Sequence, residues 1–368
     1  MIKQYYKQAL AQLRQHPLIS IIGIVGTALS IFLIMLVVMM QQVKVAPFSP
    51  ESNRNRFLHV HYMSISHKDW GNGTSNGPMS VQTAREVYKS LKAPEAVTVY
   101  CCMTVSTPVS LPGAPAIGAD VRETDDTFFH VFDFQFTDGK PYDEATFTAG
   151  RPVAVITESI SRALFGSIQS VGKEFLLSHA PYRVVGVVKD VSTLADMAYG
   201  QVWIPFTSTN LSNDTWSDNH MGMMSVTLLA HDREDFDEIR AEAKRRMNEY
   251  NSILADQGYT LIDRNRPYDQ ETQSISFAAN LEPDLKAARR ERVIVFIILL
   301  LVPAINLSSM TQSRLRQRVA EIGVRRAFGS TRIEMVGQIV MENLVITLLA
   351  GAIGLLISIL FAFWGTVI

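Results

Sequence analysis

The sequence has few cysteines and almost no net charge. Its two cysteines, Cys101 and Cys102, are adjacent. Neighbouring residues of a strand point to opposite faces, so we expect buried free thiols rather than a strained vicinal disulfide or a redox pair. The chain carries 34 Lys and Arg against 35 Asp and Glu. A surface that binds nucleic acid would show a basic excess, so this balance argues against nucleic acid as a partner.

The sequence also lacks two motifs that would mark catalytic chemistry. It contains no H-E-x-x-H zinc helix and no G-x-x-x-x-G-K-S/T phosphate loop. We therefore predict no catalytic residues and no cofactor.

Two groups of metal-ligating residues have simpler explanations. His59 and His61 alternate along an expected strand, and without a marked third ligand we interpret them as part of an exposed polar face. The soft ligands of HMGMM, residues 220–224, suit copper(I), but methionine more commonly fills gaps in a core. We therefore predict no metal site.

Three long apolar runs are present instead. Residues 18–40, 293–307 and 344–368 carry no charge. A helix of about 20 apolar residues crosses the hydrocarbon core of a bilayer, so we predict three membrane spans. The first run is too long for the apolar part of a signal peptide, so we interpret it as a retained anchor.

Basic residues give the expected orientation of these spans. Lys3, Lys7 and Arg14 precede the first run without any acidic residue, which places the N-terminus in the cytoplasm. The segment after the first span is then exported, and the second span returns the chain to the cytoplasm. Basic residues at 286–292 oppose this orientation, but acidic neighbours dilute them and a long segment is translocated largely regardless of its charge.

Strand and helix patterns follow one another through the exported segment. Residues 55–65, 152–157, 173–178, 182–190 and 223–230 are predicted as strands, and residues 81–92, 158–166 and 233–254 as helices. Ser80 should cap the first of these helices. Mixed strands and helices with short connections predict an α+β domain with two lobes.

The arginine-rich segment RLRQRVAEIGVRRAFGS, residues 314–330, lies between the second and third apolar runs. As a helix over 314–328 it has an apolar side, formed by Leu315, Val319, Ile322 and Phe328, and an opposite side rich in arginine. Such a helix suits either an anionic lipid surface or a protein partner.

The residues that follow define where this helix ends. Gly329 provides a left-handed stop, and Thr331 with Glu334 forms a T-x-x-E capping box for the next helix. Glu342 then places a charge in the third span, where it should face protein or the interface.

Residues 321–357 resemble the C-terminal segment of the MacB/FtsX-like ABC transporter permeases, with its pattern E-I-G-x-x-R-A-x-G-A. The matching residues are Glu321, Ile322, Gly323, Arg326, Ala327 and Gly329. Phe328 and Ser330 depart from the pattern. Residues 127–142, 153–166 and 171–191 resemble successive pieces of a MacB-type periplasmic core domain, so the resemblance covers nearly the whole chain.

The resemblance implies a fold and its order along the chain. It implies a membrane protein with transmembrane α-helices and a large extracytoplasmic α+β domain, of the MacB periplasmic core type, after the first helix. We expect a cytoplasmic segment at 1–17, spans at 18–41, 291–310 and 336–368, the outer domain at 42–290 and a cytoplasmic coupling helix at 311–335. The fourth span of the family is expected to be absent from a chain that ends at Ile368.

The resemblance also implies a function. The chain would be a non-catalytic permease subunit of the inner membrane, whose coupling helix contacts a separate cytoplasmic ABC ATP-binding subunit and passes its motion to the periplasmic domain for export or efflux. The implied coupling residues are Arg318, Glu321, Ile322, Gly323, Arg325, Arg326 and Gly329.

The implied partners are a second permease copy or a related one, the lipid bilayer, and a periplasmic adaptor or hydrolase. Gly351 and Gly354 allow the close helix approach that a dimer contact requires, or simply reflect tolerance of glycine in a membrane helix. Two other functions stay open: regulation of a cell-wall hydrolase or of cell division, as in FtsX-like proteins, and a membrane-anchored sensor with no ATPase.

Overall fold

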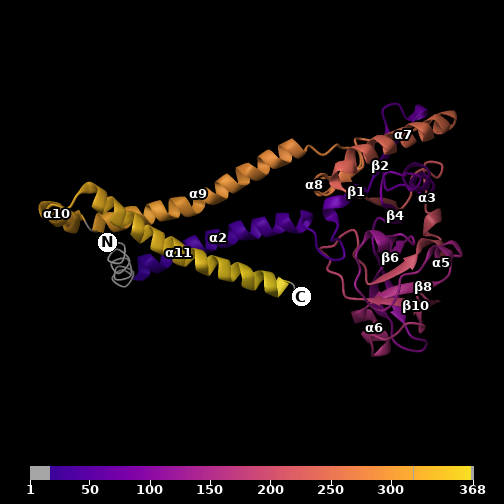
Figure 1. Ribbon diagram of the computed structural model, residues 1–368, viewed down its shortest axis with the longest axis horizontal. Helices are drawn as coiled ribbons and strands as arrows, with labels where there is room; N and C mark the ends of the chain where they lie inside the picture. Colours follow the sequence, from indigo (N-terminus) through magenta and orange to yellow (C-terminus); the bar gives the residue numbers. More distant parts are fainter. Residues whose placement is uncertain (1–16, 318, 366–368) are drawn as a thin grey trace. The chain divides into compact units, whose positions relative to one another are not determined.

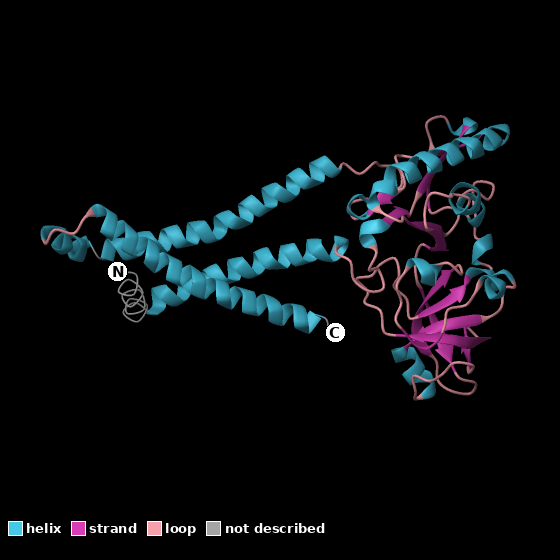
Figure 2. Cartoon of the chain, in the orientation of Figure 1, coloured by secondary structure: helices cyan, strands magenta, loops and turns pink. Residues whose placement is uncertain are grey.

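The computed structural model describes residues 17–317 and 319–365. They divide into two compact units. Val43–Asp284 forms one unit, and the helices before and after it form the other. Figure 2 shows that the unit Val43–Asp284 contains the strands together with several helices, whereas the other unit is helical.

Within the described residues, the helical unit contains three long helices, α2 (Pro17–Val45), α9 (Leu285–Gln317) and α11 (Arg332–Gly365) (Figure 1). Each is long and apolar enough to cross a membrane. Helix α9 continues well beyond its apolar run, because residues 308–317 contain no glycine or proline that would end it. The described residues are helical on both sides of residue 318: 314–317 belong to the last turn of α9, and α10 spans Val319–Ala327.

Hydrogen bonds between polar side chains link these helices. Asn306 Nδ2 of α9 donates to Thr27 Oγ1 of α2 at 3.4 Å. Thr311 Oγ1 of α9 donates to Asn343 Oδ1 of α11 at 3.0 Å. Interhelical hydrogen bonds of this kind are a common source of affinity between membrane helices, where apolar burial provides little.

The other unit is an α+β domain. Its strands are β1 (Phe57–Val60), β2 (Met63–His67), β3 (Thr74–Gly77), β4 (Ala96–Cys101), β5 (Val105–Ser110), β6 (Ile117–Thr124), β7 (Phe136–Gly139), β8 (Val153–Thr157), β9 (Glu174–Leu177), β10 (Ala180–Val188), β11 (Val202–Pro205), β12 (Met224–Leu229), β13 (Tyr259–Ile262) and β14 (Tyr268–Asp269). Its α-helices are α3 (Val81–Ala84), α4 (Phe128–Val131), α5 (Glu144–Thr148), α6 (Glu158–Phe165), α7 (Phe236–Leu254) and α8 (Gln270–Gln273).

The larger sheet contains a closed ring of strands. In order, β6, β5, β9, β10, β8 and β11 pair with their neighbours, and β11 returns to pair with β6. From β6 the same sheet continues through β4, β12 and β1 to β14, while β13, β2 and β3 form a separate small sheet. The expected lobes thus share one sheet that runs through a single compact unit.

Local signals in the sequence define the ends of several helices, and the cap predicted at Ser80 is present. Ser80 Oγ accepts a hydrogen bond from Thr83 N at 3.1 Å and caps α3. Gly166, with a φ of +70°, ends α6 as a left-handed cap.

The single strand expected at 55–65 is wrong. The chain forms β1 in the large sheet, leaves it at His61 and Tyr62, and forms β2 in the small sheet. Both strands bury apolar side chains, and no glycine or proline lies between them, so the sequence pattern hides the change of sheet.

Candidate functional site

Helix α10 has a defined C-terminal end. Gly329 N donates to Arg326 O and Ser330 N donates to Arg325 O, both at 3.1 Å, and the φ of Gly329 is +93°. These two bonds form a Schellman motif. The next helix is capped as predicted, because Thr331 N donates to Glu334 Oε2 at 2.9 Å and Glu334 N donates to Thr331 Oγ1 at 3.3 Å.

Arg325 fixes α10 to α11. Its guanidinium donates to Glu321 Oε1 at 2.6 Å and to Gln338 Oε1 at 2.8 Å. Gln338 Nε2 in turn donates to Glu342 Oε1 at 2.9 Å, and both Gln338 and Glu342 are buried. The expectation that Glu342 faces protein is confirmed. Arg325 stiffens the turn within this chain, whereas the sequence placed it on the outward side.

The apolar side chains of α10 are not gathered on one covered side. Ile322 is half-buried together with Arg325. Val319, Val324, Arg326 and Phe328 are exposed, and Phe328 shows 89% of its surface. Arg318, which the sequence also assigned to this surface, lies outside the described residues.

Gly323 lies in the exposed middle of α10. A Cβ added to it would meet nothing within 4 Å, so packing inside the described chain does not require glycine there. Glycine in an exposed helix costs about 1 kcal/mol relative to alanine. A surface that another backbone approaches closely would account for this residue.

Gly354 of α11 makes a close approach within the chain. A Cβ on Gly354 would lie 2.7 Å from the carbonyl oxygen of Ala28 in α2, whereas one on Gly351 would first meet Ile31 Cδ1 at 3.8 Å. The close helix packing at Gly354 is therefore made to α2 of the same chain. A contact between two copies through these glycines stays a prediction.

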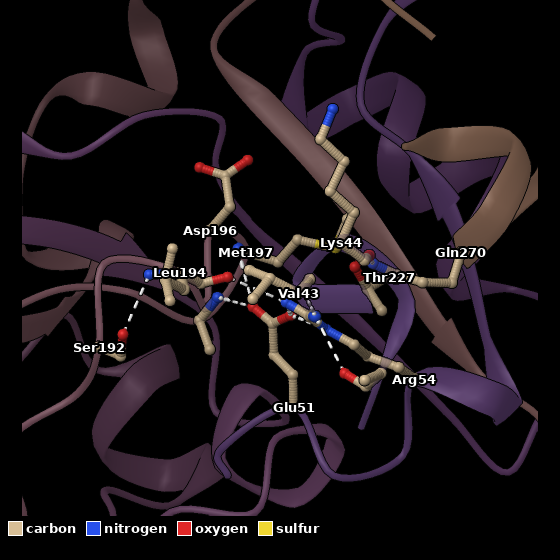
Figure 3. Close-up of polar contacts among 12 residues, drawn as sticks. Val43, Lys44, Glu51, Arg54, Ser192, Leu194, Asp196, Met197, Thr227 and Gln270 are labelled. Atoms are coloured by element: carbon tan, nitrogen blue, oxygen red, sulfur yellow. Dashed lines mark hydrogen bonds and ion pairs between the residues drawn. The ribbon is translucent and has the colours of Figure 1, made fainter. Parts of the chain in front are cut away.

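A second polar site surrounds the C-terminal end of α2, which the sequence did not reveal (Figure 3). The last carbonyls of a helix have no partner within the helix. Here Arg54 Nη1 donates to Val43 O at 2.6 Å and to Ala46 O at 3.1 Å, and Arg54 Nη2 donates to Leu194 O at 3.0 Å.

Glu51 balances the charge of Arg54. Arg54 Nε donates to Glu51 Oε2 at 2.7 Å, and both side chains are buried, with 3% and 0% of their surface exposed. The other carboxylate oxygen, Oε1, accepts from Met197 N at 2.9 Å and from Ala198 N at 3.0 Å. This ion pair therefore ties the helix end to a distant segment of the outer domain.

Gln270 binds the same helix end from another side. Its Nε2 donates to Lys44 O at 2.8 Å, which leaves Oε1 to accept from His59 Nε2 at 2.9 Å. His59 Nδ1 then accepts from Thr227 Oγ1 at 3.1 Å. His59 is fully buried, so the exposed polar face predicted for it is wrong: β1 lies between β12 and β14 inside the sheet.

Burial lowers the pKa of His59 well below its ordinary value of 6.5. As the pH falls through 6.5, His59 gains a proton in the unfolded chain but not in the folded chain. The contribution of His59 to the free energy of unfolding is therefore complete above pH 6.5 and falls as the pH drops below it. At pH 7.5, we expect His59→Leu to have a free energy of unfolding about 1–3 kcal/mol lower than that of wild type. Below pH 6.5 this difference should shrink by about 1.4 kcal/mol per pH unit. Urea unfolding at pH 7.5, 6.5 and 5.5 measures the difference, and a constant value would contradict the assignment.

The remaining candidate groups have structural roles. Both cysteines are free, Cys101 buried and Cys102 half-buried, so the prediction of buried thiols is correct for Cys101 only. Met221 and Met224 of HMGMM lie in the core, as predicted. His220 binds Gln257 Oε1 through Nε2 at 3.1 Å.

One stretch carries the letters of a serine-hydrolase motif. GTSNG at 73–77 matches G-x-S-x-G, whose serine must sit on a sharp strand-to-helix turn. Ser75 instead lies within β3, and its Oγ accepts a hydrogen bond from Trp216 Nε1 at 3.0 Å. The nucleophile geometry is not formed at this serine.

Two family models match successive parts of the chain. Residues 18–246 match the model of the MacB-like periplasmic core domain, and residues 293–364 match the FtsX-like permease C-terminal model. The periplasmic region of MacB from Actinobacillus actinomycetemcomitans is similar at 17% identity and a TM-score of 0.37, covering 55% of this chain and 88% of that one. The extracellular domain of YknZ from Gram-positive bacteria gives 14% identity and a TM-score of 0.39, covering 55% of this chain and 99% of that one.

Curated relatives agree with these matches. The uncharacterized ABC transporter permease YknZ of Bacillus subtilis is 20% identical over 95% of this chain and 83% of its own length. The macrolide export ATP-binding/permease protein MacB of Escherichia coli O157:H7 is 23% identical over 67% of this chain, and the chain spans only 36% of that protein. Because the periplasmic core model alone covers more than half of the chain and the permease model follows it in order, the chain belongs to the MacB/FtsX-type family of ABC transporter permeases.

Proposed function

We propose that this chain is the permease subunit of an ABC assembly, and that a separate cytoplasmic ATP-binding subunit docks on α10. ATP-driven motion of that subunit would move α10 and the spans, and the outer domain would perform export or efflux in the periplasm. This requires α10 and the N-terminus in the cytoplasm and the outer domain beyond the inner membrane, as the basic residues of the N-terminal segment suggest.

The observation that carries the proposal is that α10 is fixed to α11 through Arg325 while other side chains on and next to α10 are exposed. The hydrogen bond from Arg325 to Gln338 fixes α10 to α11, so a force on α10 would be passed to the third span. Val324 of α10 and Phe328 just beyond its end are exposed, and so is Gly323. Exposed apolar side chains and an exposed glycine suit a protein partner that approaches closely, and an exposed aromatic residue is a common anchor of such interfaces.

Phe328→Ser tests this docking surface. Phe328 is 89% exposed, so its loss should leave the fold intact, while co-purification with the ATP-binding subunit from native membranes should fall at least about tenfold, equivalent to about 1.4 kcal/mol. Quantitative mass spectrometry of the purified chain measures the associated ATPase.

Phe277→Ser is the matched control. Phe277 is also highly exposed, at 81%, but belongs to the outer domain, so its replacement should leave the ATPase yield unchanged. Equal ATPase yields from Phe328→Ser and wild type would refute docking on α10. Binding of α10 to anionic liposomes alone, with no ATPase recovered from wild type, would favour the lipid-surface interpretation instead.

A further inference from the structure

The backbone from Leu194 to Tyr199, here called the strap, is held by three buried charged side chains. Arg54 binds Leu194 O, and Glu51 binds the amides of Met197 and Ala198. From the other side, Arg122 Nη2 donates to Asp196 O at 2.9 Å and Arg122 Nε donates to Tyr199 O at 2.6 Å. An irregular segment with so many directed bonds is fixed in position, because each bond restricts the backbone at a separate point.

Arg122 links the strap to the end of β4. Its Nη1 donates to Cys101 O at 3.0 Å, and its guanidinium lies 5.8 Å from the ring centroid of Tyr100. The first route therefore runs from Val43 and Ala46 through Arg54, Glu51 and the strap to Arg122 and Cys101.

A second route reaches the same strand end from Lys44. It passes through Gln270, His59 and Thr227, and Thr227 Oγ1 lies 2.8 Å from Tyr100 OH. Two chains of hydrogen bonds thus connect the C-terminal turn of α2 to neighbouring residues of β4, Cys101 and Tyr100. Strand β4 pairs with β12 on one side and with β6 of the closed ring on the other.

Stability alone does not explain this arrangement. Replacing a buried ion pair by apolar side chains is often neutral or stabilising, so charges at this position are better explained by a need for a directed, rigid connection. Apolar packing would let the helix end slide or rotate, whereas the planar guanidinium of Arg54 holds three carbonyl oxygens and a carboxylate at fixed angles.

We infer that Arg54 and Gln270 are positioning residues for force transmission, which make the last turn of α2 a two-point joint. Displacement of the first span is delivered through this joint to the end of β4 and from there to both parts of the large sheet. This inference rests on the proposed function, since it assumes ATP-driven motion of the spans.

The test compares wild type with Arg54→Lys in the complete assembly, purified with its ATPase and placed in lipid nanodiscs. Lysine keeps a positive charge beside Glu51 but lacks the fork that reaches Val43 O and Leu194 O together. Hydrogen exchange of residues 96–101 and 194–199 is measured without nucleotide and with Mg·ATP. We expect the ATP-dependent change in exchange to fall at least fivefold in Arg54→Lys, with unchanged ATPase association and a cooperative unfolding transition that shows the variant is still folded.

Arg162→Lys is the matched control, because Arg162 forms an exposed ion pair with Glu158 on α6 and takes no part in either route. If Arg54→Lys does not fold, the same measurement on Gln270→Glu tests the joint. This substitution keeps the side-chain shape but replaces the Nε2 donor to Lys44 O by a carboxylate oxygen. An ATP response equal to that of wild type in the folded variant overturns the joint. No ATP response in wild type, with or without the ATPase bound, overturns the proposed function itself.

Discussion

Glu51→Ala is expected to lower the free energy of unfolding of the outer domain by about 3–5 kcal/mol, because it removes one partner of a buried ion pair. Arg54 would keep its charge in a site with 3% exposure, and the amides of Met197 and Ala198 would lose their acceptor. Urea unfolding of the full chain in detergent, followed by tryptophan fluorescence, measures the loss.

Glu174→Ala provides the comparison for this experiment. Glu174 pairs with Arg183 at 3.1 Å, but more than half of each side chain is exposed, so this pair should contribute no more than about 1 kcal/mol. A loss for Glu51→Ala as small as that for Glu174→Ala would show that Arg54 finds other compensation, and that the junction at the end of α2 is looser than its distances indicate.

Elements with strong local signals could be predicted from the sequence. The strand Val153–Thr157, the helix Glu158–Phe165 and its stop at Gly166 follow from β-branched residues, helical spacing and a left-handed glycine. The turn between α10 and α11 follows from Gly329 and the capping residues Thr331 and Glu334. In each case the physical cause lies within a few residues of the element.

Pairings between distant parts of the chain could not be predicted in this way. The ring of strands closes because β11 pairs with β6, and neither strand carries a sign of its partner. The change of sheet between β1 and β2 is hidden for a similar reason, since apolar residues are buried in both sheets.

The candidate sites show the same limit. Glu51 and Arg54 are three residues apart, a spacing typical of exposed pairs, and only the fold brings Leu194 and Gln270 to the same helix end. The inward position of Arg325 depends on Gln338, nearly two turns into the next helix. A family resemblance can identify such segments, but it does not say which side chains face inward.

Gly354→Ala is expected to lower the stability of the helical unit by about 1–3 kcal/mol, as overpacking does in a closely packed contact. The new Cβ would lie 2.7 Å from the carbonyl oxygen of Ala28 and 3.1 Å from Ile31 Cβ. A backbone oxygen cannot rotate away as a side chain can, so α11 must move away from α2. Unfolding in SDS, followed by the circular dichroism of the helices, measures the change.

Gly351→Ala separates this packing from a contact between two copies. Its new Cβ would first meet Ile31 Cδ1 at 3.8 Å, an ordinary van der Waals distance, so the stability of the single chain should change by less than about 0.5 kcal/mol. If Gly351→Ala nevertheless weakens association of two permease copies while Gly354→Ala mainly destabilises the chain, the two glycines serve different neighbours. If neither substitution changes stability, the close approach of α2 and α11 at Gly354 is not a feature of the folded protein in a membrane.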